Sequence, residues 1–376
     1  MINGPTPRGC SALFGAAPSD YDMTRGSPMS LIEGLPDAIT LECLARLPYS
    51  LYRSLCLVSR SWRDAIQSQY LFKARINANS TEDLLCVSAF QPENLWQLYD
   101  PSTDVWMTLP PHPSTIKQLK RFGTACIGGN LFIIGGGSDG VDPNTGDRDG
   151  TLATNEVWSY DPVRCHWSPC APMLAARTMF ACCSFKGRIV VAGGLNNRHK
   201  AMTSAEAYDP ELDIWVPIPN LCQAHNLGCS GLVVSGKVHV MHKGTPSMEV
   251  WDGGEHGWEI ANCGWPEWPA VVAGEKVYFV SHGRVEEWGD GGRAPMKVVG
   301  QGPEPRGGGF GVGFIRGKLF VVGGWNISGM RRSNMNIELL ADVDMLDLGE
   351  EELAWRRVAP MTRCRGTVVG CTSLRI

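Results

Sequence analysis

The chain has 376 residues, of which 43% are apolar and only 19% charged, with 44 glycines, 25 prolines and 13 tryptophans. A formal net charge of −4 and a pI near 6.1 exclude an overall basic field of the kind that attracts nucleic acid or an anionic membrane. No stretch approaches the roughly 20 apolar residues that a membrane span needs. The length predicts two soluble domains of unequal size, and the many turn residues predict that the larger one is built from short strands.

Residues 1–29 are rich in glycine, proline and serine and lack the apolar run of a signal peptide. We therefore expect a disordered N-terminal tail and a location in the cytoplasm, the nucleus or both. The 14 cysteines contain no Cys-x-x-Cys pair, and several, such as Cys126 and Cys229, lie in apolar runs. We expect them to be reduced and buried, with no disulfide, no metal and no other cofactor.

Residues 30–72 show helical periodicity. The first apolar stripe recurs every four residues at Leu35, Ile39, Cys43 and Leu47. Pro36 and Asp37 are typical of a helix start, Pro48 is typical of a stop, and either Ser59 or Ser61 can cap a third helix. Three short helices bury little surface on their own, so the module is a candidate docking surface.

This stretch resembles an F-box, whose pattern is two Leu-Pro pairs around an apolar helix and a Val-Ser-Lys/Arg-x-Trp ending. The matching residues are Leu35-Pro36, Ile39, Leu44, Leu47-Pro48, Leu55, Val58-Ser59-Arg60 and Trp62. The resemblance implies docking onto the Skp-type adaptor of an SCF ubiquitin ligase, and through it contact with cullin and RING subunits. The implied adaptor-binding residues are Leu35, Pro36, Ile39, Leu44, Leu47, Pro48, Val58 and Trp62. The alternative is a small helical cap on the next domain.

After a predicted linker at 73–83, residues 84–376 contain an internal repeat of short apolar runs. Three copies end their second strand on a glycine doublet, at Gly135-Gly136, Gly193-Gly194 and Gly323-Gly324. Weaker copies surround Val240 and Val277, and the latter has no doublet, which leaves its blade geometry open. The unit, with a later Tyr-Asp-Pro turn and a fourth-strand tryptophan, resembles the kelch repeat of β-propellers.

The two ends of the repeat region complement each other. The unit that starts at Leu84 lacks a first strand, whereas Arg365–Leu374 is a first strand with nothing after it. Joining them completes one blade and removes the open sheet edges. Dividing the span 84–374 by six gives about 48 residues per blade, close to the kelch period of about 50. We therefore predict an all-α F-box followed by an all-β, six-bladed kelch propeller.

Enzymatic chemistry is suggested only weakly. Gly135-x-Gly137-x-x-Gly140 matches a dinucleotide fingerprint, but Pro143 follows where the phosphate-binding helix has to begin. The loop Asp142–Asp147 lacks the ligand order of a calcium site. His239 and His242 are three residues apart on a strand and point to opposite faces. No nucleophile and base pair emerges, and the residue set of a copper-dependent propeller oxidase cannot be assembled, so we expect a non-catalytic protein.

In kelch propellers that recognise proteins, the loops between strands two and three and between blades share the binding face. By resemblance these loops contain Lys117, Lys120, Arg121, Arg148, Arg198, Lys200, Arg306, Arg331 and Arg332. Such a basic rim favours an acidic segment or a phosphopeptide. The alternative is that these charges are simply solvated, since Asp139, Asp142, Asp147 and Asp149 lie among them.

An F-box joined to a kelch propeller resembles a family that is expanded in plants. The resemblance implies a substrate-recognition subunit of an SCF-type E3 ubiquitin ligase, which holds an unidentified protein target for ubiquitination and proteasomal degradation. It needs no catalytic residue and binds neither nucleic acid nor membrane. The alternative is a kelch scaffold without a ligase role, and a propeller oxidase is the third candidate.

Overall fold

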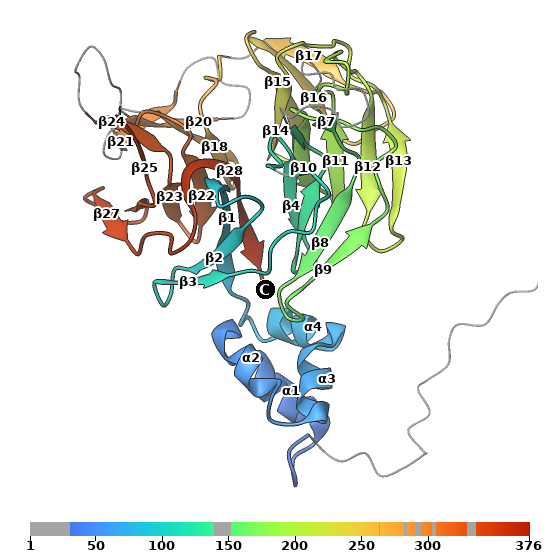
Figure 1. Ribbon diagram of the computed structural model, residues 1–376, viewed down its shortest axis with the longest axis vertical. Helices are drawn as coiled ribbons and strands as arrows, with labels where there is room; N and C mark the ends of the chain where they lie inside the picture. The colour runs from blue at the N-terminus through green and yellow to red at the C-terminus, as the bar shows by residue number, and fades with distance from the viewer. Residues whose placement is uncertain are drawn as a thin grey trace, which may run out of the picture.

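A computed structural model describes residues 31–116, 118–138, 152–262, 264–281, 284–289, 295–302, 306–328 and 336–376. The described chain forms a small helical module followed by a ring of β-sheets, and the module lies beneath the ring (Figure 1). The predicted tail, residues 1–29, lies outside the described residues. This arrangement confirms the predicted fold class.

The helical module contains α1 (Asp37–Ala45), a 3-10 turn (Tyr49–Leu51), α2 (Tyr52–Leu55), α3 (Arg60–Ile66) and α4 (Gln69–Asn77). As predicted, α1 begins directly after Pro36 and ends before Pro48. Ser59 caps α3, because its hydroxyl accepts the backbone N–H of Trp62 at 3.1 Å. The predicted linker differs from the structure: its first five residues, 73–77, form the second half of α4.

Six four-stranded antiparallel sheets form the blades. Blade 1 is β4 (Gly123–Ile127), β5 (Asn130–Ile134), β8 (Val157–Asp161) and β9 (His166–Cys170), and blade 2 is β10 (Ala181–Phe185), β11 (Arg188–Ala192), β12 (Ala205–Asp209) and β13 (Ile214–Ile218). Blade 3 is β14 (Cys229–Val234), β15 (Lys237–His242), β16 (Ser247–Trp251) and β17 (Glu259–Asn262), and blade 4 is β18 (Ala270–Ala273), β19 (Lys276–Val280), β20 (Arg284–Trp288) and β21 (Lys297–Gln301). Blade 5 is β22 (Gly311–Ile315), β23 (Lys318–Val322), β26 (Val343–Asp347) and β27 (Trp355–Val358).

Blade 6 closes the ring with strands from both ends of the repeat region. The last strand, β28 (Arg365–Arg375), pairs with β1 (Asp83–Gln91), and Leu84 lies opposite Leu374. The blade continues through β2 (Trp96–Asp100) and β3 (Val105–Thr108). The predicted closure and the count of six blades are confirmed. The weak copy around Val277 also forms a complete blade, with a register irregularity between Val285 and Glu286.

Two hairpins extend from the second-to-third-strand loops. They pair β6 (Gly137–Ser138) with β7 (Leu152–Ala153) in blade 1 and β24 (Trp325–Ser328) with β25 (Asn336–Leu339) in blade 5. Both add backbone to the face that the sequence indicates for target binding.

Fourth-strand tryptophans join neighbouring blades. The indole N–H of Trp215 in blade 2 donates to the carbonyl of Ala171, which follows the last strand of blade 1, at 2.9 Å. Three more bonds repeat this pattern: Trp106 to Ala359, Trp167 to Pro110 and, directly before the fourth strand of blade 3, Trp258 to Pro219. Each ring therefore contributes both buried apolar area and a directional bond between blades.

The glycine doublet is required by close backbone approach. Gly194 has a φ of +86°, and a Cβ there would lie 2.6 Å from the carbonyl oxygen of Thr178 and 2.6 Å from the Cβ of Phe180. No residue with a side chain fits this position without moving backbone.

His112, in the connection from blade 6 to blade 1, makes the stability depend on pH. Its ring is 5% exposed and packs edge-on against Trp167 at 4.9 Å. Burial lowers the pKa of His112 from 6.5 to about 4, although the carboxylate of Glu156 opposes the shift. The unfolded chain therefore binds a proton at this histidine below pH 6.5, whereas the folded chain does not bind it until the pH falls to about 4.

We expect the stability to fall by about 3 kcal/mol between pH 6.5 and 4, because the unfolded chain binds this proton and burial keeps it from the folded chain. Urea unfolding of the native protein and of His112→Phe between pH 4 and 7.5 measures it. The pH slope of the variant should be smaller by one proton. Equal slopes in the two proteins would show that His112 is not the responsible group.

Candidate functional sites on the helical module and the loop face

The helical module divides its apolar side chains between an interior and an exposed surface. Leu44, Ile66 and Leu71 are at most 1% exposed and form the interior. Ile39, Leu57 and Val58 are 49%, 79% and 61% exposed. Exposed apolar side chains of this size make this surface a candidate partner-binding site.

The eight residues predicted to bind the adaptor fall on both sides of this division. Pro36, Ile39, Pro48 and Val58 are exposed, Leu35, Leu47 and Trp62 are half-buried, and Leu44 is buried. Trp62 is held in place because its indole N–H donates to the carbonyl of Leu31 at 2.7 Å. Leu57, the most exposed of these apolar side chains, lies in the turn before α3 and was not predicted, since it falls outside the helical stripes.

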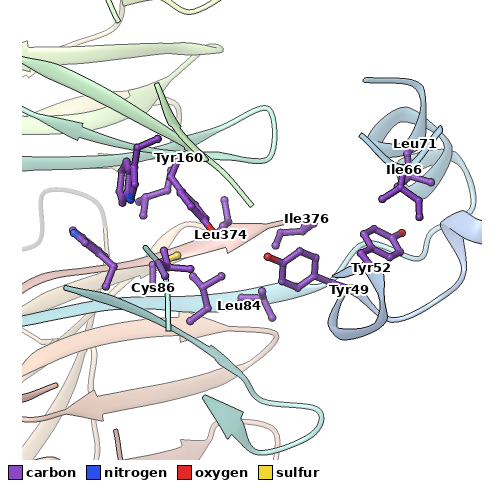
Figure 2. Close-up of a cluster of buried hydrophobic side chains, with 14 of the residues drawn as sticks. Tyr49, Tyr52, Ile66, Leu71, Leu84, Cys86, Tyr160, Leu374 and Ile376 are labelled. Carbon is purple, nitrogen blue, oxygen red and sulfur yellow. The ribbon is translucent and has the colours of Figure 1, made fainter. Parts of the chain in front are cut away.

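The module is joined to the propeller by a continuous apolar cluster. Tyr49 and Tyr52 from the module share this cluster with Leu84, Leu374 and Ile376 from blade 6 (Figure 2). The hydroxyl of Tyr49 donates to the carbonyl of Pro162 in blade 1 at 2.8 Å. The two domains are therefore packed into one body rather than linked by a free tether.

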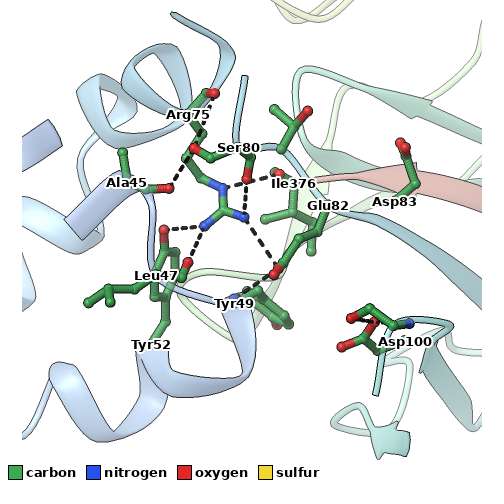
Figure 3. Close-up of polar contacts among 12 residues, drawn as sticks. Ala45, Leu47, Tyr49, Tyr52, Arg75, Ser80, Glu82, Asp83, Asp100 and Ile376 are labelled. Atoms are coloured by element: carbon green, nitrogen blue, oxygen red, sulfur yellow. Dashed lines mark hydrogen bonds and ion pairs between the residues drawn. The ribbon is translucent and has the colours of Figure 1, made fainter. Parts of the chain in front are cut away.

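Arg75 of α4 lies at the centre of the polar part of this joint (Figure 3). Its side chain is 1% exposed. The guanidinium donates to the carbonyls of Leu47 at 2.9 Å, Ser80 at 2.8 Å and Ile376 at 3.2 Å, and also to the hydroxyl of Tyr52. An ion pair with Glu82 at 3.2 Å balances its charge. One buried cation thus connects the first helices, the linker and the closing strand.

The loop face, which carries the loops between second and third strands and the connections between blades, retains part of the predicted basic rim. Arg121, Arg198 and Lys200 are exposed. Arg198 and Lys200 also line a shallow cavity of about 390 Å³ beside blade 2, together with Asn196. Lys117, Arg148, Arg331 and Arg332 lie outside the described residues, as does the segment Asp142–Asp147.

The prediction is wrong for Arg306. Arg306 is only 5% exposed. Its guanidinium forms an ion pair with Asp344 and donates to the carbonyl of Gly323. Arg177 in blade 2 makes the equivalent contacts, to Glu206 at 2.6 Å and to the carbonyl of Gly193 at 2.9 Å. Arg306 is therefore an internal ion-pair residue that holds its blade connection, and is not a rim charge.

Within the described ranges, no three His, Cys, Asp or Glu side chains come together as a metal site. Nε2 of His242 lies 3.0 Å from Oε1 of Glu249, whereas His239 packs against Trp265. The two histidines thus contact different residues, as expected for side chains on opposite faces of a strand. In that same part of the chain, no helix has the length and apolar character needed to cross a membrane.

Comparison with known proteins agrees with both domains. The F-box domain family matches residues 32–74, and the kelch motif family matches residues 119–174 and 176–221. The F-box/kelch-repeat protein SKIP30 of Arabidopsis thaliana is 50% identical over 348 residues, covering 92% of this chain and 97% of that protein. Another Arabidopsis thaliana F-box/kelch-repeat protein is 31% identical, with the same coverage. The solved structure of YjhT covers 73% of this chain and 94% of its own, with a TM-score of 0.54 and 12% identity, which supports the propeller fold.

Proposed function

The chain belongs to the F-box/kelch-repeat proteins, and on that premise we propose that it is the target-binding subunit of an SCF-type ubiquitin ligase. F-box/kelch-repeat proteins are generally non-catalytic receptors of such ligases. The helical module docks the Skp-type adaptor, which connects to cullin and RING subunits. The propeller holds a protein whose lysines are then ubiquitinated.

The observation that carries this proposal is the exposed apolar surface of the module. α4 is the helix nearest the propeller, and α1 and α3 extend away from it (Figure 1). Ile39 of α1 and the Leu57-Val58 turn remain uncovered by either domain. Desolvation of such side chains by a partner helix is the usual source of binding energy at a small interface.

The packed joint supports the receptor mechanism. Since Arg75 and the apolar cluster connect module and propeller, a target on the loop face is held at a restricted distance from the adaptor. A restricted geometry raises the effective concentration of target lysines near the conjugating enzyme.

Adaptor capture tests the proposal. We expect Leu57→Asp with Val58→Asp to weaken binding to a recombinant Skp-type adaptor at least about 30-fold, because two apolar anchors are replaced by charges. Both side chains are largely exposed, so the fold should tolerate the change. Leu212→Asp, at a 65% exposed leucine on the propeller, is the matched control and should bind normally.

The rival function is a kelch scaffold in which the module only caps the propeller. That reading predicts no adaptor binding by the intact chain and no difference between the three proteins. Failure of the unaltered protein to capture the adaptor would therefore refute the ligase role.

A further inference from the structure

A pocket of about 510 Å³ opens between blades 3 and 4 on the loop face. It is bounded by the loop from β15 to β16 and by the connection from β17 to β18. Its apolar lining includes Leu232, Met241, Met248, Trp265, Trp268 and Pro266. The volume lies within the range of pockets that bind ligands, roughly 300–1,000 Å³.

The pocket lies where the repeat pattern breaks. In blade 1, Met173, the third residue after the fourth strand, packs on the first glycine of the doublet, and a Cβ on Gly135 would lie 2.5 Å from it. Leu221 on Gly193 and Met361 on Gly323 repeat this contact. Blade 3 has His242-Lys243 in place of the doublet, and its third residue is Trp265. Without a glycine to receive it, the larger side chain lines an open pocket.

A departure from an otherwise consistent pattern is expected at functional sites rather than at random. The two blades that flank this pocket are the two with the weakest repeat signal. Blades 1, 2 and 5, which keep the doublet, use the same position for packing. The pocket therefore lies at one of the blades in which the doublet is missing.

The lining selects the chemistry of the ligand. Tryptophan and methionine side chains favour an aromatic group through stacking and sulfur contacts. A cationic ligand is disfavoured, because the guanidinium of Arg284 already lies over the ring of Trp268, 5.5 Å from its centroid.

The charged residues at the rim of this pocket also bear on the chemistry of the ligand. Glu267 accepts the backbone N–H of Gly244, which ties the two bounding loops together. Lys243 is exposed and has no ion-pair partner among the described residues. An acidic group beside the aromatic one would meet this ammonium.

We propose that this pocket binds an aromatic side chain of the target polypeptide, with a neighbouring acidic residue of the target facing Lys243. The inference rests on the proposed receptor function, since it names the target chemistry that the propeller recognises. It places the recognition site at blades 3 and 4 rather than along the basic loops of blade 2.

The test uses the full chain labelled at its methionine methyl groups with carbon-13. The probe is an acetylated, amidated pentapeptide with a central phenylalanine flanked by aspartates. We expect it to shift the methyl signals of Met241 and Met248, assigned with Met→Leu variants, and to leave Met173 and Met361 in blades 1 and 5 unchanged. A lysine-flanked peptide should bind about threefold more weakly, as one exposed charge pair predicts.

Lys243→Met should remove the preference for aspartate flanks. Lys237→Met, at an exposed lysine where β15 begins, at the opposite end of the strand from Lys243, is the matched control and should keep it. Ser230→Leu fills the pocket from β14 and should abolish the shifts with all peptides.

Three results would overturn the proposal. The first is that no aromatic peptide shifts Met241 or Met248. The second is that free 3-phenylpropionate binds as tightly as the peptide, which assigns the pocket to a small aromatic acid. The third is self-association of the chain that Trp268→Ala abolishes, which assigns it to a second copy. Adaptor capture, measured on the same samples, reports separately on the ligase role.

Discussion

Replacing Arg75 by methionine is expected to lower the free energy of unfolding by about 3–5 kcal/mol, the cost of removing one partner from a buried ionic network. Methionine fills similar volume but donates nothing. The carbonyls of Leu47, Ser80 and Ile376 then lose their donor, and Glu82 loses its cation. Denaturant unfolding monitored by circular dichroism measures the change.

The joint also predicts how the variant unfolds. Since Arg75 connects the module to the closing strand, we expect the helical signal to be lost at lower denaturant than the strand signal in the variant, and both to be lost together in the native protein. Arg46→Met is the matched control, because Arg46, directly after α1, forms an exposed pair with Glu42 at 3.2 Å. That change should cost at most about 0.5 kcal/mol. Equal effects of the two substitutions would contradict the role assigned to Arg75.

The architecture was predictable because its signals repeat. The glycine doublets at Gly135, Gly193 and Gly323 recur with apolar strands before them and tryptophans after them, so each copy supports the others. The closure followed from two incomplete units that complement each other, and the pairing of Leu84 with Leu374 confirms it.

The joint was not predictable, since its contacts are distant in sequence. Arg75 falls in the segment interpreted as a linker, and its bond to Ile376 spans 301 positions. A local pattern cannot indicate that a charged side chain near the end of a helix is buried by a strand from the other end of the chain. Leu57 was missed for a related reason: its exposure depends on the turn between α2 and α3 and not on helical spacing.

Arg306 was misassigned although the sequence held a usable signal. Both Arg177 and Arg306 stand in the connection that precedes the first strand of their blades, and each donates to the first glycine of the following doublet. Treating this arginine as a member of the repeat, together with the acidic residue of the third strand, would have indicated an internal ion pair instead of a rim charge.

The buried pair in blade 2 gives the second large effect. Arg177 and Glu206 are 0% and 2% exposed and lie 2.6 Å apart. Burial lowers the pKa of Arg177, and Glu206 offsets this by favouring the charged form. We expect Arg177→Met to cost about 3–5 kcal/mol in urea unfolding, because Glu206 is left as an unpaired buried carboxylate.

The same blade contains the control. Arg188 and Asp209 lie 3.2 Å apart, with the arginine side chain 53% exposed, so Arg188→Met should cost at most about 1 kcal/mol. A further variant separates the charge from the hydrogen bonds. In Arg177→Met with Glu206→Leu both charges are gone, and we expect part of the lost stability to return, because no uncompensated ion remains.

Full recovery is not expected in that double variant. Arg177 also donates to the carbonyls of Gly193 and Ser204, at 2.9 Å and 2.8 Å, and Glu206 accepts the backbone N–H of Leu174 at 2.7 Å. Gly193 and Ser204 flank the loop from β11 to β12, whereas Leu174 lies in the connection from β9 to β10, so these bonds join the two segments at the loop face. If the double variant is as unstable as the sum of the single variants Arg177→Met and Glu206→Leu, the pair carries no coupling energy, and the ion pair is not what holds these segments.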